Sequence, residues 1–320
     1  MNKKSLLILI TVAITAAIFN LKTKSDLPIV AIANYGPHAS LNASIEGLKD
    51  EMKQQGFIEN QTIRYEMADV GFDPALIPQM VVKLKNNAPK VMVVLATPIA
   101  QFAKGKIKDI PLVYSAITDP IKAGLLKDKN HADGNMVGSS DMQDLGAFLK
   151  FAKTILKNAK TVGLLYATAE SNDLALLNMM NLAASIEGMN VVAIPVNQSR
   201  DVVMNMQAFK GKVDLIYVGT SGPIQPALPT IAQEAKKMNI PVFNSESQAV
   251  KDGLALASFG VDYHSVGRNT GKLVADLLKG VEVGKLTPLY PTFKDHHGIV
   301  SRKKAAELGV VIPANIKIVE

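Results

Sequence analysis

Residues 28–67 read PIVAIANYGPHASLNASIEGLKDEMKQQGFIENQTIRYEM. The apolar run at 28–35 predicts a strand, and the amphipathic stretch at 40–55 predicts a helix that stops at Gly56. A second strand is expected at 62–67. Strands that are apolar on both faces and separated by helices are typical of a parallel sheet covered by helices on both sides. This segment therefore predicts an α/β fold.

The same alternation continues along the chain and begins again near residue 161. In the first half, a helix is expected at 74–86 and strands at 91–95 and 112–117. In the second half, strands are expected at 161–166, 191–196, 215–218 and 242–244, with helices at 174–186, 202–209 and 227–238. Two pairs of segments are similar: EMKQQGF at 51–57 and ASIEGM at 184–189, and DIPLV at 109–113 and NIPVF at 239–243. We therefore expect two similar α/β lobes.

The segment from Gly253 onward belongs to neither repeat. It predicts a strand at 254–259, a helix at 265–278 and a short tail. Such a segment most simply crosses back to complete both sheets, and several crossovers would form a hinge. We expect two Rossmann-like lobes with parallel sheets, joined by a multi-crossover hinge. Lobe 1 is expected to hold residues 26–141 plus 263–290, and lobe 2 residues 142–262 plus 291–320.

The N-terminus has the layout of a bacterial secretory signal, because two lysines in Met1–Ser5 precede an apolar run at Leu6–Phe19. The run is shorter than the ~20 residues of a typical spanning helix. Small residues at Thr15–Ala17 offer a cleavage site. Residues 1–25 are therefore expected to be a signal peptide that exports the protein to the periplasm. An uncleaved N-terminal anchor and a buried helix are the alternatives.

The composition excludes several classes of function. The chain of 320 residues has no Cys, which excludes disulfides, thiolate metal sites, cysteine nucleophiles and a cysteine lipid anchor. Its 35 Lys and Arg residues exceed its 28 Asp and Glu residues, for a net charge of +7. The basic residues are scattered rather than clustered, which argues against a nucleic-acid partner. The chain also has no Trp, so an aromatic pocket must be built from Tyr, Phe and His.

Ligands of open parallel sheets bind beyond the carboxyl ends of the strands. The expected strand ends of this chain are rich in hydroxyl groups, with a few carboxylates. The candidate ligand-binding residues are Tyr35, His38, Thr97, Thr118, Asp119, Ser140, Tyr166, Thr220, Asn244 and Glu246. Hydroxyl groups and helix N-terminal amides suit the carboxylate of a small zwitterion, and Asp or Glu suits its ammonium group. For any one of the Ser, Thr, Asp and Asn residues, capping of a helix N-terminus is the competing interpretation.

Enzyme motifs are weak in this sequence. The segment GRNTGK at 267–272 is one residue short of a phosphate-binding loop and is followed by Leu273. A dinucleotide-binding glycine pattern and a Gly-x-Ser-x-Gly elbow are both missing. The histidines do not have the spacing of a zinc site, so neither a metal nor a cofactor is expected. Ser140, Asp141 and His38 could form a nucleophilic site only in principle, because no elbow or base spacing supports it.

The segment IPLVYSAITDPIKAGL at 110–125, followed by GNMVGSS at 134–140, resembles one family. It is similar to the tryptophan/tyrosine-type substrate-binding proteins of bacterial ABC transporters, which have the type I periplasmic-binding-protein fold. Weaker matches are ATPIAQ at 96–101, GVDYHSVGR at 260–268 and KKAAELGVVIP at 303–313. The resemblance covers essentially the whole chain after the N-terminal segment. Members often carry Pro-Gly-Gly-Asn where this chain has ADGN at 132–135, a loop expected to lie outside the ligand contacts.

The resemblance implies a monomeric protein, not an enzyme, that binds a small molecule between its lobes. The ligand would be an amino acid, aromatic in several members, delivered to an inner-membrane permease that an ATPase drives. By the same resemblance, Thr97 and Thr118 would hold the carboxylate and amine, and Glu246 would be the ammonium partner from the second lobe. Tyr35, His38 and Tyr166 would flank the ligand side chain. A membrane-tethered or periplasmic ligand sensor on the same fold is the alternative, and the identity of the ligand stays open.

Overall fold

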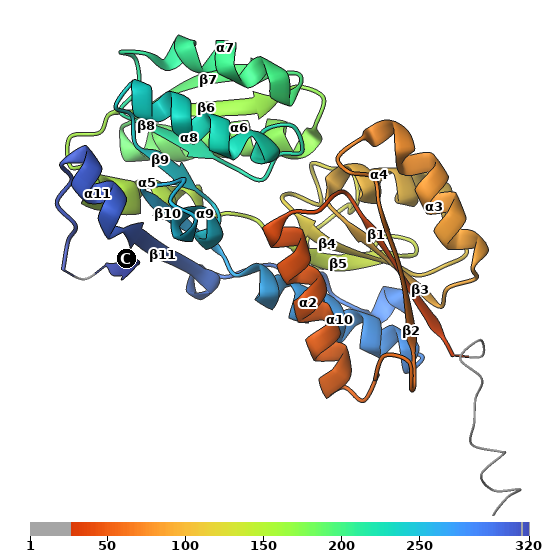
Figure 1. Ribbon diagram of the computed structural model, residues 1–320. Helices are drawn as coiled ribbons and strands as arrows, with labels where there is room; N and C mark the ends of the chain where they lie inside the picture. Colours follow the sequence, from red (N-terminus) through yellow and green to blue (C-terminus); the bar gives the residue numbers. More distant parts are fainter. Residues whose placement is uncertain (1–26, 315, 320) are drawn as a thin grey trace, which may run out of the picture.

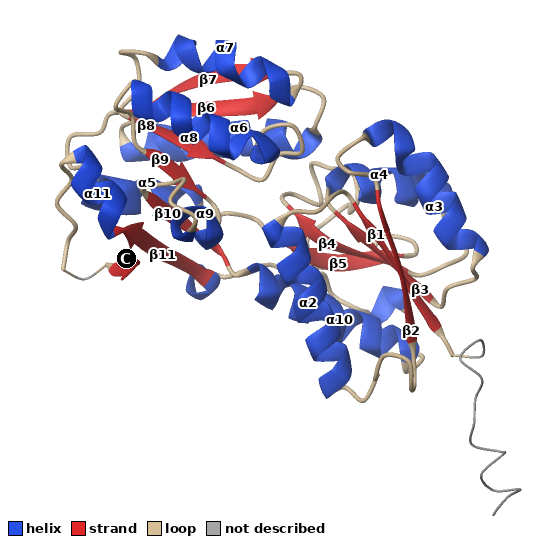
Figure 2. Ribbon diagram, viewed as in Figure 1, coloured by secondary structure: helices blue, strands red, loops and turns tan. Residues whose placement is uncertain are grey.

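The computed structural model describes residues 27–314 and 316–319, which form two α/β lobes side by side (Figure 1). Each lobe is built around its own sheet, shown in red in Figure 2. The signal peptide or anchor expected at residues 1–25 lies outside the described residues.

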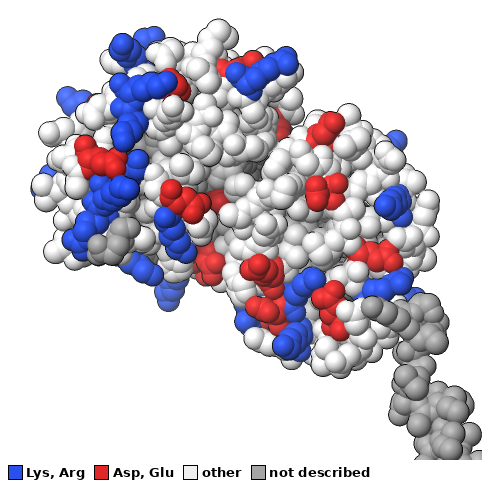
Figure 3. Space-filling model, viewed as in Figure 1, with Lys and Arg blue, Asp and Glu red and all other residues white. Residues whose placement is uncertain are grey.

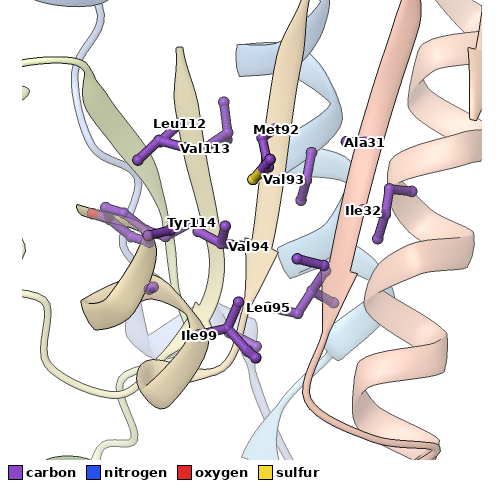
Figure 4. Close-up of a cluster of buried hydrophobic side chains, with 14 of the residues drawn as sticks. Ala31, Ile32, Met92, Val93, Val94, Leu95, Ile99, Leu112, Val113 and Tyr114 are labelled. Carbon is purple, nitrogen blue, oxygen red and sulfur yellow. The ribbon is translucent and has the colours of Figure 1, made fainter. Parts of the chain in front are cut away.

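The sheet of lobe 1 is parallel throughout, with strand order β2-β1-β3-β4-β5. Its strands are β1 (Ile29–Asn34), β2 (Arg64–Asp69), β3 (Val91–Leu95), β4 (Leu112–Ile117) and β5 (Met136–Ser140). Helices α2 (Ala39–Gln54) and α10 (Tyr263–Leu278) cover one face, and α3 (Ile77–Asn86) and α4 (Thr97–Lys106) cover the other (Figure 1). Strands β1, β3, β4 and β5 are buried at every residue, as expected for a sheet covered on both sides. Figure 4 shows part of this core, with Met92 and Val94 on β3 and Tyr114 on the neighbouring strand β4.

The sheet of lobe 2 is mixed, with strand order β12-β11-β10-β9-β8-β6-β7. Its strands are β6 (Thr161–Ala167), β7 (Asn190–Val196), β8 (Leu215–Val218), β9 (Val242–Asn244), β10 (Ala257–Val261), β11 (His296–Ser301) and β12 (Lys317–Val319). One face packs against α5 (Leu145–Ile155), α6 (Ser171–Glu187) and α11 (Arg302–Leu308). The other packs against α7 (Val202–Met206), α8 (Leu228–Lys237) and α9 (Ser247–Lys251).

The predicted fold class is confirmed, with two corrections in lobe 2. Strand β11 runs antiparallel to β10 and β12 follows β11, so this sheet is not parallel throughout. The strand predicted at 254–259 begins at Ala257, because the residues before it finish the turn after α9. In that turn Gly253 has φ +69°, and the Leu254 N–H donates to the Ala249 carbonyl oxygen.

The chain passes between the two sheets in three places. It leaves lobe 1 after β5, returns from β10 into α10, and leaves again between α10 and β11. Helix α10 packs against α2 in lobe 1. Leu289 also stays with lobe 1, because it exchanges backbone hydrogen bonds with Gly138 and Ser140 of β5. These crossovers place the carboxyl ends of the two parallel strand sets opposite each other.

Candidate functional site

A cavity lies between the lobes, at the carboxyl ends of the strands. Its walls come from both lobes and enclose about 480 Å³ of space, including the open mouth. The lining residues are Tyr35, His38, Ser40, Leu41, Phe72, Ala96, Thr97, Pro98, Ala116, Thr118, Asp141, Glu170, Asn172, Thr220, Ser221, Gly222, Gln225 and Tyr263. They include two carboxylates and neither Lys nor Arg. Figure 3 shows the surface around the junction of the lobes mainly in white and red.

Glu170 connects the two lobes across the cavity. It lies at the N-terminus of α6, and its Oε1 accepts a hydrogen bond of 3.1 Å from the hydroxyl of Tyr35, which follows β1. Its Oε2 accepts from the Gly222 backbone N–H at 3.1 Å and from Asn172 Nδ2 at 3.2 Å. Burial and the Glu170 charge raise the pKa of Tyr35, which keeps its phenol protonated as a donor. The Glu170 carboxylate is thus held in place by uncharged donors.

Asp141 also lines the cavity and directly follows β5. Its Oδ2 accepts a hydrogen bond of 2.8 Å from the hydroxyl of Tyr263, at the start of α10. Its Oδ1 is buried and has no hydrogen-bond partner among the residues that the structure describes. Burial raises the pKa of Asp141 to about 6, so the carboxyl group is mostly ionised at neutral pH. An ionised oxygen without a donor is costly to bury, which makes Oδ1 a natural position for a donor from a ligand.

Asp173 is a second buried carboxyl group close to Glu170, in the first turn of α6. Its Oδ2 accepts a hydrogen bond of 2.5 Å from the Ala167 backbone N–H at the end of β6. Burial and the neighbouring Glu170 charge raise the pKa of Asp173 to about 8. Because two close carboxylates do not both ionise readily, Asp173 is mainly neutral at pH 7.

Hydroxyl groups and a strained backbone form the lobe 1 side of the cavity. Thr97 is the first residue of α4, so its side chain and the free amides of that helix end lie beside the cavity. The residue before it, Ala96, has φ +68° and ψ +154°, a conformation that residues other than Gly rarely adopt. Ala116, which also lines the cavity, has φ +56° at an irregularity of β4. Such strain costs ~1–3 kcal/mol per residue and concentrates at ligand-binding sites.

An aromatic wall closes the cavity at the Glu170 end. The ring of Phe72, in the loop after β2, meets the ring of Tyr35 edge-on with 5.6 Å between centroids. Leu41 and Pro98 add apolar surface to the same cavity. Rings in this arrangement can pack against a third, planar group.

The structure brings together five of the predicted site residues: Tyr35, His38, Thr97, Thr118 and Thr220 all line the cavity. The other five do not line it. Asp119 Oδ1 accepts from the backbone N–H groups of residues 121 and 122, and Ser140 Oγ donates to the Ile117 carbonyl oxygen at 2.7 Å. Tyr166 is half-buried on β6 outside the lining.

Asn244 and Glu246 lie beside the cavity rather than in its wall. Asn244 is fully buried, and its Oδ1 accepts from the Glu246 backbone N–H at 2.7 Å. Glu246 Oε1 accepts from Gln225 Nε2 at 3.0 Å and lies 3.5 Å from His38 Nδ1 of lobe 1. Glu246 lines a neighbouring groove instead, so its position differs from that of Glu170 and Asp141.

The predicted ligand-binding residues did not include several residues that line the cavity: Phe72, Asp141, Glu170, Asn172, Gln225 and Tyr263. Asp141 could have been selected from the sequence, because it directly follows the predicted site residue Ser140. Glu170 lies farther into a loop, and no local pattern distinguishes it from a surface glutamate. Ser140, Asp141 and His38 do not form the nucleophilic site considered from the sequence. The Ser140 hydroxyl donates to a backbone carbonyl, and His38 Nδ1 accepts from the Ser40 N–H.

A model of the family described as ABC transporter substrate binding protein matches residues 27–319. The chain belongs to this family. It is a family of solute-binding proteins that work with ABC permeases, and it is not an enzyme family. Among the described residues, no group of three or more His, Asp and Glu side chains could hold a metal ion. Within the same part of the chain, no helix is long and apolar enough to span a membrane.

Individual relatives also support the assignment of this substrate-binding protein to the family. A tyrosine-binding protein of Clostridioides difficile (strain R20291) is 29% identical over 257 residues, covering 80% of this chain and 74% of that protein. A conserved domain protein from Vibrio cholerae is 30% identical with a TM-score of 0.87, covering 92% of this chain and 99% of that one. An ABC domain from Streptococcus pneumonia in complex with L-Trp is 26% identical with a TM-score of 0.86, covering 92% and 100% of the two chains. These relatives confirm the resemblance to the tryptophan/tyrosine type.

Proposed function

We propose that this substrate-binding protein is the solute-binding component of a bacterial ABC importer that captures an aromatic amino acid between its lobes. The observation that carries the proposal is the chemistry of the cavity. It combines buried carboxylates for an ammonium group, hydroxyls and the α4 N-terminus for a carboxylate, and the Tyr35–Phe72 wall for a ring. The complex with L-Trp and the tyrosine-binding relative support the ligand class.

Delivery of the ligand requires that the lobes open and close. The TM-score with the L-Trp complex is 0.86, against 0.71 with a ligand-free, open substrate-binding protein from Clostridium difficile that is 28% identical. This difference, together with the Tyr35–Glu170 hydrogen bond, supports assignment of the present arrangement to the closed form. Because the ligand contacts both lobes only when they are shut, ligand favours closure, and the closed form then docks on the permease.

The proposed moving units are residues 26–141 plus 263–290 and residues 142–262 plus 291–320. The packing of α10 on α2 and the pairing of Leu289 with β5 support the return of the chain to lobe 1. The pairing of β11 with β10 supports its final passage into lobe 2. Substrate-binding proteins of ABC systems are periplasmic or extracellular. For this chain we propose the periplasm, with residues 1–25 as export signal or anchor, a monomeric state and no enzymatic activity.

The proposal is tested by a thermal-shift and calorimetric screen of the exported protein against the twenty amino acids. A ligand at a hundred times its dissociation constant adds about 2.7 kcal/mol to the stability of the native state, which is readily detected. We expect aromatic amino acids to raise the melting temperature most. A folded, ligand-free sample that responds to no amino acid would contradict the proposed ligand class. The N-terminal residue of the exported protein separates a free periplasmic protein from a tethered sensor.

A further inference from the structure

The two carboxylates of the cavity lie near different strands of lobe 1. In lobe 1, Tyr35 follows β1 and Asp141 follows β5, and the strand order places β3 and β4 between them. At ~4.8 Å per strand, the two strand ends are ~14 Å apart. Glu170 is hydrogen-bonded to Tyr35 and therefore lies at the β1 end. The two acidic groups thus lie at different strand ends of lobe 1, Asp141 at β5 and Glu170, through Tyr35, at β1.

Neither acidic group has a cationic partner among the residues that line the cavity. Glu170 accepts only from a phenol, a backbone amide and a carboxamide, and Asp141 accepts at Oδ2 only from a phenol. Both side chains are buried, with 7% and 2% of their surface exposed. A buried carboxylate is stabilised by charged or strongly polar donors, so each end is prepared for a donor that the ligand supplies.

The residues around Asp141 indicate that its carboxylate binds the α-ammonium group of the ligand. Asp141 lies next to Thr118, because β4 and β5 are neighbours and its N–H donates to the Ile117 carbonyl oxygen at 3.2 Å. Thr118 and Thr97, at the ends of β4 and β3, are the hydroxyl groups suited to the α-carboxylate. Since the carboxylate and ammonium of an amino acid share one carbon atom, the ammonium falls at the adjacent Asp141.

The surroundings of Glu170 assign it to the far end of the ligand side chain. The rings of Tyr35 and Phe72 lie at this end, so a ligand ring packed there places its outer edge toward Glu170. The Glu170 carboxylate is fixed by its three donors and still has lone pairs to accept another hydrogen bond.

We propose that the site recognises two donors on one ligand: Asp141 binds the α-ammonium, and Glu170 accepts a hydrogen bond from an O–H or N–H on the ligand ring. This inference rests on the proposed function and deepens it. It makes Glu170 a specificity-determining residue that favours a phenol or an indole over a plain phenyl ring. Phenylalanine would leave the charged Glu170 desolvated without the additional donor.

The test is calorimetric titration of the exported protein with L-Tyr, L-Trp and L-Phe. We expect L-Tyr or L-Trp to bind ~10–100-fold more tightly than L-Phe, the range for one hydrogen bond to a charged group. In Glu170→Gln this preference should shrink to within a fewfold, because the amide keeps the size of the side chain but loses its charge. In Asp141→Asn all three ligands should weaken together.

The matched control is Glu187→Gln, the same chemical change at the far end of α6, where the partly buried Glu187 pairs with the exposed Lys150. It should leave all three affinities unchanged. The wild-type ratio of L-Tyr and L-Trp to L-Phe needs no variant, so a misfolded variant does not prevent the test. Equal binding of the three ligands by the wild type, or equal loss for all three in Glu170→Gln, overturns the inference while amino-acid binding stands. Binding of none of them by the folded protein refutes the proposed function itself.

Discussion

Asp173 is a buried carboxyl group whose ionisation opposes folding. Its pKa is raised to about 8 in the folded protein, because it is buried beside the Glu170 carboxylate. In the unfolded chain the pKa is ~3.9. Between these two values the folded state binds more protons than the unfolded state, so this residue lowers the free energy of unfolding as the pH rises from about 4 to 8.

We expect Asp173→Asn to remove this pH dependence. The amide oxygen can still accept from the Ala167 N–H, but the group no longer ionises. The variant should therefore gain stability relative to the wild type as the pH rises, exceeding it by at least ~1 kcal/mol at pH 8, since one pKa unit corresponds to ~1.4 kcal/mol. Thermal melts at pH 4, 6 and 8 measure this, with Asp252→Asn at an exposed position as control. Parallel melting curves for Asp173→Asn and the wild type would disprove it.

Helices α2 and α10 are distant in the sequence but pack closely together, because each has a glycine at the point of contact. A Cβ atom added at Gly267 would lie 2.0 Å from the Ser44 carbonyl oxygen, and one added at Gly47 would lie 2.0 Å from the His264 carbonyl oxygen. The backbones therefore touch, which explains Gly267 of the GRNTGK segment without a phosphate ligand. This contact anchors the returning chain to lobe 1.

Gly267→Ala should destabilise the protein by about 1–3 kcal/mol, because the added methyl group forces the two helices apart. Gly105→Ala in α4 is the control, since its added Cβ would have no heavy atom within 4 Å. That control should be neutral or stabilising by ~0.5–1 kcal/mol, the usual advantage of Ala over Gly in a helix. Urea unfolding midpoints distinguish the two variants. Similar midpoints would show that the α2–α10 contact adapts to a methyl group.

In the whole molecule, the two lobes approach each other closely at Gly222. A Cβ atom added there would lie 2.4 Å from Glu170 Oε1 and 2.6 Å from Tyr35 Cε1. Tyr35 comes from lobe 1, whereas Gly222 and Glu170 belong to lobe 2. A side chain at this position would have to displace the Glu170 carboxylate or the Tyr35 ring.

Gly222→Ala should hinder closure while leaving each lobe folded. A clash of ~1–3 kcal/mol in the closed form alone weakens ligand binding roughly 5- to 150-fold. Small-angle X-ray scattering with ligand should give a larger radius of gyration than for the wild type under the same conditions. Gly146→Ala, whose added Cβ makes an ordinary 3.5 Å contact, should behave as the wild type. Full closure and unchanged affinity in Gly222→Ala would show that Tyr35 and Glu170 move aside.

The residues of the central strands could be predicted from the sequence because burial on both faces leaves a continuous apolar run. Strands β3, β4, β8 and β9 begin and end at the predicted residues. Thr97 and Thr118, which lie just after β3 and β4, could also be predicted as site residues, since ligand sites lie beyond the carboxyl ends of parallel strands. These predictions use local information: they depend on neighbouring residues and on the spacing of apolar residues along the sequence.

The partners across the cavity could not be predicted in this way. Tyr35 and Glu170 are 135 residues apart and meet only because the crossovers bring the two lobes together. The direction of β11 and the choice of Asp141 rather than Ser140 for the cavity wall also depend on packing between distant segments. The periodic pattern of the chain thus determines which segments become strands and helices, because their burial and backbone hydrogen bonds repeat along the chain. The approach of the lobes determines which side chains form the site, because that approach arises from contacts between residues far apart in the sequence.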